Sequence, residues 1–396
     1  MQILGTEQTR LGRGKVFVFA IASGLGVANL YYNQPVLADM ARSFNVSPNE
    51  AGLIPMFAQF GYALGLLMIV PLGDVLERRR FINVMLGLVI CALVAAALSP
   101  SLNWLAVANL AIGITTVVPH IIVPLVALLA KPSEQGKVLG TVMSGVFVGA
   151  VLARSIGGII GHSWGWRSLY WLAAGLMLLL SVILARQIPY IPTKVKLDYG
   201  KLMRSLWQVF RSQPKLREAA LNGALLFAAF SAFWATVTFY LSSLPAHYDS
   251  SILGLLALMS IPAAAFAPVV GKISDRYGSR LMVGVGISIS IVAFLTFWIF
   301  GSSLWGMAAG IFLLSVGTQA NMVSNQARIF PLIPDAKSRL NTVYMVSYFI
   351  GGASGSFLGA TAWSLYQWHG VCSIALILSI LDLIIHLISS EKSIVD

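Results

Sequence analysis

Arg154, His120, Asp382 and His386 stand inside long apolar runs, where ionisable side chains are rare and tend to be functional. Histidine changes its charge near neutral pH, so His120 is a candidate proton carrier. Asp382 and His386 are spaced i, i+4 on one helix face and form a second candidate for proton coupling. Each candidate has a structural alternative: a neutral histidine that hydrogen-bonds between helices, and an Asp–His pair that only stabilises a peripheral helix.

Arg154 is the first candidate for a substrate-binding residue. An arginine near the centre of a spanning helix costs about 2.5–3.5 kcal/mol on insertion scales, and it normally faces a cavity or a partner. The alternative is a side chain that extends along the helix to the lipid headgroups. We disfavour that alternative because Arg154 lies far along the apolar run from Lys137, which marks its basic end.

Polar and aromatic side chains in other apolar runs are further candidates for binding a solute. They are Asn29, Tyr32, Asn33, Gln34, Gln59, Tyr62, Asn109, Asn321, Asn325, Gln326, Tyr344 and Tyr348. Aromatic rings stack on amphipathic solutes, and amides bind hydroxyl groups. The same side chains also form interfacial belts and hydrogen bonds between helices, so each one alone fits either role.

The elements that must position these residues are membrane-spanning helices. Of the 396 residues, 58% are hydrophobic and only 10% are charged, whereas a soluble domain carries about 25% charged residues. A helix that spans the hydrocarbon takes about 20 apolar residues. The runs of this kind are 16–36, 50–72, 81–100, 104–128, 137–160, 167–186, 218–243, 251–271, 281–300, 304–327, 340–364 and 370–388. The sequence therefore predicts an all-α integral membrane protein with twelve transmembrane helices.

The basic residues set the orientation of these helices. The formal net charge is +12, from 26 Lys and Arg against 14 Asp and Glu. With the N-terminus inside, all basic residues except Arg42, Arg154 and Arg167 fall on the cytoplasmic side, as the positive-inside rule requires. The positive net charge therefore indicates how the helices are oriented in a lipid bilayer, and it does not indicate nucleic-acid binding. It predicts a bacterial inner-membrane protein with both termini in the cytoplasm and an uncleaved first helix.

Features of an enzyme or a receptor are missing from the sequence. Cys91 and Cys372 lie in apolar runs and offer neither a disulfide framework nor a metal cluster. No glycine loop with Lys-Ser or Lys-Thr cradles a phosphate, so direct use of ATP is not expected. A membrane enzyme or receptor would need clustered carboxylates, metal-spaced histidines or a nucleophile with its base. We expect no metal, no cofactor and no enzymatic activity.

A repeat divides the chain into two halves. Four residues of the fifth run and the loop after it recur at a common offset of 202 residues: Gly149, Ala153, Trp166 and Arg167 as Gly351, Gly355, Trp368 and His369. Parallel repeats predict an N-terminal six-helix bundle at 1–186 and a C-terminal one at 218–396, with a cavity between them. The cytoplasmic linker at 187–217 contains an amphipathic segment that suits the headgroup layer. A regulatory or partner site in the linker is the alternative.

Two charged loops carry the most specific pattern. Residues 271–280 read G-K-I-S-D-R-Y-G-S-R, and residues 73–80 form a degenerate copy with Glu77 in the place of aspartate. The glycines permit a tight turn, and the charged groups pair or cap across the bundle and so latch one conformation. The candidate gating residues are Gly73, Asp74, Glu77, Arg78, Arg80, Gly271, Asp275, Arg276, Gly278 and Arg280. The alternative is two basic turns with no gating role.

With this loop pattern the chain resembles the major facilitator superfamily over nearly its whole length. The string Y-Y-N-Q-P at 31–35 is similar to that of bacterial drug and sugar exporters of the drug:proton antiporter-1 type. The family's fourth helix usually carries an arginine where this chain has Asn109. One hypothesis is that Arg154 supplies the charge that is missing there.

The fifth run also resembles the glycine-rich antiporter signature of the family's exporters. Its small residues are Gly140, Gly149, Ala153, Gly157 and Gly158. The signature has Gly-Pro where this chain has Ala153 followed by Arg154. Small residues at this spacing also serve simple helix packing, which is the alternative to an antiport function.

The resemblance implies a secondary transporter that works by alternating access as a monomer and exports a small organic or amphipathic compound in exchange for protons. The proton carrier stays open, because no Asp or Glu lies in the interior of the runs expected to line the cavity. The alternative is a uniporter or a proton-coupled importer of a sugar-like or anionic solute. In that case the amides would bind hydroxyl groups and Arg154 would bind a negative group.

Overall fold

The computed structural model describes residues 12–74, 76–131, 134–188, 199–333 and 336–389, and these residues form helices and no strands. The helices of the first half are α1 (Arg13–Ala28), η1 (Gln34–Val36), α2 (Leu37–Phe44), α3 (Pro48–Ala51), α4 (Leu53–Met68), η2 (Val70–Asp74), α5 (Arg78–Ala97), α6 (Leu102–Thr115), α7 (Val118–Leu129), α8 (Gln135–Trp164) and α9 (Trp166–Gln187). They are followed by α10 (Tyr199–Ser212), α11 (Pro214–Ser243), α12 (Ser250–Ala257), η3 (Leu258–Ser260), α13 (Ile261–Tyr277), α14 (Ser279–Phe300), α15 (Leu304–Ile329) and α16 (Lys337–Ile388).

Nine helices in the described part of the chain are long and apolar enough to cross a membrane. This confirms the all-helical membrane class that the composition predicts. The nine include α16, which covers two of the predicted runs, and they leave out α1 and the shorter apolar stretch Ser250–Ala263. The count of twelve spans stays a prediction.

Prolines and a local bend explain where the helices depart from the predicted runs. The run 104–128 is divided into α6 and α7 because Pro119 lies in the first turn of α7, where a missing N–H is tolerated. Likewise, η3 interrupts the run 251–271 directly before α13, which has proline in its first turn. Within α16, Tyr366 (φ −134°, ψ 16°) and Gln367 (φ 54°, ψ −143°) are not helical, so the chain changes direction between the last two predicted runs.

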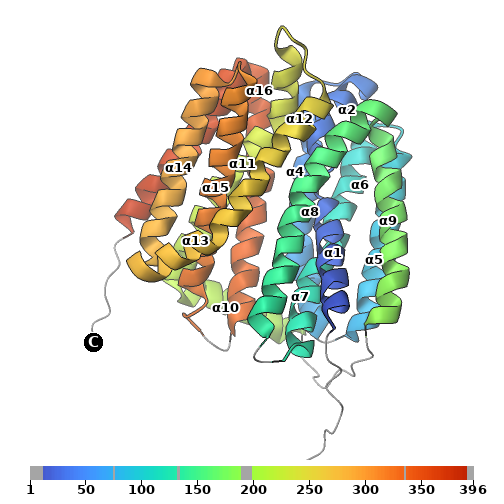
Figure 1. The fold of residues 1–396 in the computed structure, drawn as a ribbon, viewed down its shortest axis with the longest axis vertical. Helices are drawn as coiled ribbons and strands as arrows, with labels where there is room; N and C mark the ends of the chain where they lie inside the picture. The colour runs from blue at the N-terminus through green and yellow to red at the C-terminus, as the bar shows by residue number, and fades with distance from the viewer. Residues whose placement is uncertain (1–11, 75, 132–133, 189–198, 334–335, 390–396) are drawn as a thin grey trace, which may run out of the picture.

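Figure 1 shows how the helices lie relative to one another. Those coloured blue to green, which precede α10, lie toward the right, and those coloured yellow to red lie toward the left. Helices α2 and α12 lie together at the upper end, which we call the α2/α12 end. Helices α7, α10 and α13 lie at the opposite end. The predicted amphipathic segment of the linker is helical as α10, and it buries Leu206 and Val209 while Trp207 is exposed.

Glycines bring equivalent pairs of helices into backbone contact. A Cβ atom on Gly149 of α8 would lie 2.2 Å from the carbonyl oxygen of Gly24 in α1. A Cβ atom on Gly351 of α16 would lie 2.1 Å from the carbonyl oxygen of Ala224 in α11. Gly149 and Gly351 are residues that the offset of 202 pairs in the sequence. Both are therefore required by the same kind of close helix crossing, which only a residue without a side chain permits.

Candidate functional site

Arg154 lies at the centre of the candidate site, and its side chain is only 5% exposed. Its Nε donates to Oε1 of Gln34 at 2.7 Å, and its Nη1 donates to the backbone oxygen of Ala150 at 3.0 Å. Both acceptors are neutral. The structure thus joins two predicted site residues, Arg154 of α8 and Gln34 of η1.

Aromatic rings from both halves of the chain surround the guanidinium group. The Cζ atom of Arg154 lies 4.2 Å from the ring centroid of Tyr31, 4.5 Å from that of Trp234 and 5.5 Å from that of Phe230. Tyr31 follows α1, whereas Trp234 and Phe230 belong to α11. A cation over an aromatic face gains about 0.5–2 kcal/mol, depending on desolvation. The guanidinium group therefore lies where the two halves meet.

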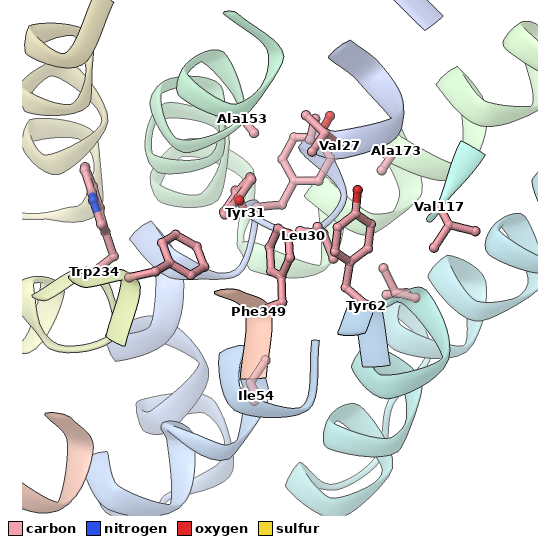
Figure 2. Close-up of a cluster of buried hydrophobic side chains, with 14 of the residues drawn as sticks. Val27, Leu30, Tyr31, Ile54, Tyr62, Val117, Ala153, Ala173, Trp234 and Phe349 are labelled. Atoms are coloured by element: carbon pink, nitrogen blue, oxygen red, sulfur yellow. The ribbon is translucent and has the colours of Figure 1, made fainter. Parts of the chain in front are cut away.

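The rings continue from Arg154 toward α4 and α7. Phe230 lies 5.5 Å from Phe227, Phe227 lies 5.4 Å from Phe349, and Phe349 lies 4.5 Å from Tyr62. Figure 2 shows Tyr31, Phe349 and Tyr62 close together in this region, with Trp234 on the other side of Tyr31. The series connects the predicted candidates Arg154 and Tyr62 through three phenylalanines that sequence reasoning did not single out.

His120 and Tyr348 lie beside this series of rings. The half-buried His120 of α7 has its ring centroid 5.7 Å from that of Tyr62, and Tyr348 stacks on Phe227 at 3.9 Å. Tyr344, one helical turn before Tyr348, is fully buried. His120 therefore lies near the candidate site, although its role as a proton carrier stays a prediction.

Gln59 forms a hydrogen-bonded contact between the halves. Its Nε2 donates to Oγ of Ser356 at 2.9 Å, and its Oε1 accepts from Oγ of Ser231 at 3.1 Å. All three side chains are buried. One amide from α4 thus satisfies hydroxyl groups on both α11 and α16, which is the geometry of a polar connection between helices.

Asn33 and Asn109 form a separate network within the first half. Asn33 Nδ2 donates to Oδ1 of Asn109 at 3.1 Å, and Asn109 Nδ2 contacts the hydroxyl of Tyr170 at 3.2 Å. Asn29 Nδ2 donates to Sδ of Met177 at 3.4 Å, and Tyr32 is buried. Since Asn33 and Gln34 are consecutive, the Asn109 network and the Arg154 site lie next to each other. That Arg154 supplies the charge missing at Asn109 stays a hypothesis.

The amides of α15 form their described hydrogen bonds within the second half of the chain. Asn325 Nδ2 donates to Oδ1 of Asn321 at 3.0 Å, and Gln326 Nε2 donates to Oδ1 of Asn341 at 3.2 Å. Asn321 and Asn325 are buried. These contacts connect α15 with itself and with α16.

Asp382 and His386 belong to a buried charged cluster that sequence reasoning found only in part. Arg328 Nη2 pairs with Oε1 of Glu218 at 3.0 Å, with side chains 8% and 14% exposed. His386 Nδ1 lies 3.9 Å from the same oxygen, and Arg280 Nη2 donates to the backbone oxygen of His386 at 2.8 Å. Both oxygens of the fully buried Asp382 carboxyl have no hydrogen-bond partner among the described residues.

The two predicted gating loops are helix boundaries. Glu77 accepts from the backbone N–H groups of Arg79 at 2.9 Å and Arg80 at 2.7 Å, and so caps α5. Gly278 joins α13 to α14 with a φ of 94°, which favours glycine. Arg276 lies over the ring of Tyr277 at 5.3 Å. The side chains of Asp74 and Asp275 and any contacts of Gly271 lie outside the described part, so the latch stays a prediction.

The α2/α12 end carries further contacts between the halves. Thr361 Oγ1 donates to Oδ1 of Asn49 at 3.2 Å, and a Cβ atom on Gly158 would lie 2.1 Å from the carbonyl oxygen of Ser250. His162 Nε2 lies 3.5 Å from Oδ2 of Asp249. Hydrogen bonds from the Ser251 hydroxyl and from backbone N–H groups lower the pKa of Asp249, so this carboxylate is ionised at neutral pH.

Sequence reasoning missed Trp234, Phe230 and Glu218. A signal for the first two was present, because Phe227, Phe230 and Trp234 are spaced three and four residues apart in one apolar run. Glu218 stands at the edge of the predicted run 218–243, but α11 begins at Pro214 and encloses it. A proline in the first turn is a known start signal for a helix.

Comparisons with known proteins agree on one family. A family model described as Major Facilitator Superfamily matches residues 16–261 and 246–393. The chain is 38% identical over 370 residues to the uncharacterized transporter YgaY of Escherichia coli O157:H7, covering 93% of this chain and 94% of that one. It is 22% identical over 361 residues to a protein of Helicobacter pylori named probable sugar efflux transporter, covering 91% of each.

Among solved structures, a bacterial homolog of the human lysosomal transporter Spinster, in an inward-facing and occupied conformation, matches with a TM-score of 0.76. The match covers 96% of this chain and 97% of that chain, at 16% sequence identity. At this identity the likeness concerns the fold alone.

Proposed function

Because this chain belongs to the major facilitator superfamily, we propose that it is a secondary transporter that moves a small organic or amphipathic solute by alternating access. The observation that carries the proposal is the position of Arg154, a buried cation held by neutral groups from both halves of the chain. Intramembrane charges of this kind mark solute pathways. The relatives named as transporters support membrane transport rather than an enzymatic reaction.

We propose that the chain crosses the membrane twelve times in two bundles, 1–186 and 218–396, joined by the linker 187–217. At 1.5 Å per residue, a straight helix of the length of α16 would measure about 78 Å against a hydrocarbon layer of about 30 Å. The bend at Tyr366 and Gln367 supports a division into two spans. On this count α6 with α7, and α12 with α13, each form one interrupted span.

In the proposed orientation the basic loops and both termini face the cytoplasm of a bacterium, and the α2/α12 end faces outward. The contacts of Gly158 and Asn49 hold the halves together at that end. Solute release on the outside then requires the halves to separate there. We propose that the loops at 73–80 and 271–280 latch the cytoplasmic end in the state in which the halves are separated on the outside. We also propose that the protein works as a monomer.

For the direction of transport we propose efflux coupled to protons. The Helicobacter pylori relative is named a probable sugar efflux transporter, and this name supports the proposal of efflux. The candidate proton carriers are His120, which lies beside Tyr62, and the pair Asp382 and His386 in the cluster with Glu218. The alternative is a uniporter or a proton-coupled importer of a sugar-like or anionic solute, which the hydroxyl-binding amide of Gln59 and the cation of Arg154 favour.

A flux assay in proteoliposomes tests this function. The purified protein is reconstituted with a pH-sensitive dye inside, a pH gradient is imposed, and a panel of neutral, cationic and anionic solutes is added. We expect one class of solute to move against its gradient and to dissipate the pH gradient as it moves. Solute flux without proton movement would overturn antiport and favour the uniporter, and the absence of any flux across the panel would contradict transport itself.

A further inference from the structure

Arg154 differs from the other deeply buried arginine of the described chain in having no acidic partner. Arg328 pairs with Glu218 at 3.0 Å. No described Asp or Glu lies within ion-pair distance of Arg154, whose two hydrogen-bond acceptors are the side-chain oxygen of Gln34 and a backbone oxygen. A buried charge is stable only when something compensates it. The site therefore favours binding of a negatively charged group, which no described residue supplies.

The described contacts of Arg154 also leave part of its hydrogen-bonding capacity unused. Arginine carries five N–H donors in a planar fork, and the described contacts use two of them. The surrounding rings of Tyr31 and Trp234 interact with the cation but do not accept hydrogen bonds in its plane. A carboxylate matches the fork with two parallel hydrogen bonds, which is the strongest pairing available to arginine.

The neighbours of Arg154 restrict the rest of the ligand. Tyr31, Phe230 and Trp234 offer apolar faces from two sides, which suits a ring or an alkyl body. Without a nearby carboxylate, an organic cation would meet only the like charge of Arg154. A ligand with several negative charges would find a single arginine to pair with.

We infer that the Arg154 site binds organic monoanions, in which one carboxylate is attached to an apolar or aromatic body. This inference rests on the proposed transport function and names its substrate class. The carboxylate pairs with Arg154 while the body lies among Tyr31, Phe230 and Trp234. Since these side chains come from both halves, the bound ligand would replace contacts of Arg154 with Phe230 and Trp234. Binding would then change the relative stability of the two states, which a solute must do to drive alternating access.

The test compares two ligands of the same shape and different charge. Purified full-length protein is titrated by calorimetry with 2-naphthoate and with 2-naphthamide. We expect 2-naphthoate to bind at least about 10-fold more tightly, because only the carboxylate forms a charge-assisted pair with the fork. Equal affinities, or no binding of 2-naphthoate, would overturn the inference.

Three variants assign the difference to Arg154. Arg154→Gln is expected to lower the affinity for 2-naphthoate at least about 10-fold and to leave that for 2-naphthamide unchanged. Arg154→Lys keeps the positive charge but lacks the planar fork, so it should retain part of the preference for 2-naphthoate over 2-naphthamide. It also keeps the inference testable if the glutamine variant fails to fold. Arg167→Gln is the matched control, because the described contacts of Arg167 are with Trp166 at 4.1 Å, Phe44, Ser43 and Ser99, and none of these residues contacts Arg154. It should bind both ligands like the wild type.

The outcomes separate this inference from the transport function. Wild-type affinity for 2-naphthoate in both Arg154 variants would overturn the anion site. Flux of a neutral or cationic solute in proteoliposomes, with no discrimination between the naphthalene ligands, would also overturn it while leaving transport intact. A lack of flux for every solute would instead contradict the proposed function.

Discussion

Replacing Gly158 with leucine is expected to lower solute flux by roughly 5- to 150-fold. A Cβ atom at this position would lie 2.1 Å from the carbonyl oxygen of Ser250 and 2.9 Å from Cα of Gly254. Both neighbours are backbone atoms, so they cannot rotate away as a side chain does. Overpacking costs about 1–3 kcal/mol, and each 1.4 kcal/mol is tenfold in an equilibrium constant, so the ratio of the closed to the open state of the α2/α12 end should fall by that factor.

The matched control for this variant is Gly140→Leu in the same helix. A Cβ atom on Gly140 would have no neighbour within 4 Å, so the same change of side chain adds bulk without a clash. Flux of the solute identified in proteoliposomes is measured for both variants, together with monodispersity in detergent. Wild-type flux in Gly158→Leu would show that closure between α8 and α12 is not part of the cycle.

Replacing Glu218 with glutamine is expected to destabilise the protein by about 3–5 kcal/mol, because the change leaves a buried arginine without its counter-charge. Arg328 and Glu218 are 8% and 14% exposed, and they lie 3.0 Å apart. The effect is measured as a fall in the midpoint of thermal unfolding in detergent. The double variant Glu218→Leu with Arg328→Met is expected to recover most of the loss, since replacing both partners removes the uncompensated charge.

Asp39→Asn is the control for an ion pair of low energetic value. Asp39 pairs with Arg42, whose side chain is 66% exposed, and pairs of this kind contribute about 0–1 kcal/mol. If Glu218→Gln and Asp39→Asn lowered the midpoint of thermal unfolding equally, burial would not determine the strength of the Glu218–Arg328 pair. A double variant as unstable as Glu218→Gln would point to a role other than charge compensation.

Arg154 was predictable because a charge in an apolar run is visible in the sequence alone. Its partners Phe230 and Trp234 were not predictable in the same way. Their spacing places them on one face of α11, but most residues of this helix are apolar and buried, so the spacing does not indicate which other helix that face meets. Only the docking of distant segments places Trp234 over Arg154.

The limits of the helices were harder to predict than their existence. The run 104–128 is one apolar stretch in the sequence, but the structure divides it into α6 and α7, with Pro119 in the first turn of α7. Hydropathy does not register such a division, because both flanks are apolar. Hydropathy also begins the predicted run at Glu218, whereas α11 begins at Pro214. A short polar stretch before a span can join the helix at no cost in lipid exposure.

Gln59 illustrates why residue type alone left its role open. An amide in a spanning helix binds a solute or joins helices, and the sequence does not distinguish the two. The structure joins it to Ser231 and Ser356 across the halves.

Cross-linking the α2/α12 end tests alternating access most directly. Cysteines replace Asn49 and Thr361, whose side chains are 3.2 Å apart, in a background in which Cys91 and Cys372 are changed to alanine. A short linker that reacts with both thiols and is cleaved by reductant is then applied. We predict that cross-linked protein carries no flux, that reduction restores the flux, and that each single cysteine variant transports with and without the linker. Full flux through the cross-linked protein would contradict transport by separation of the two halves.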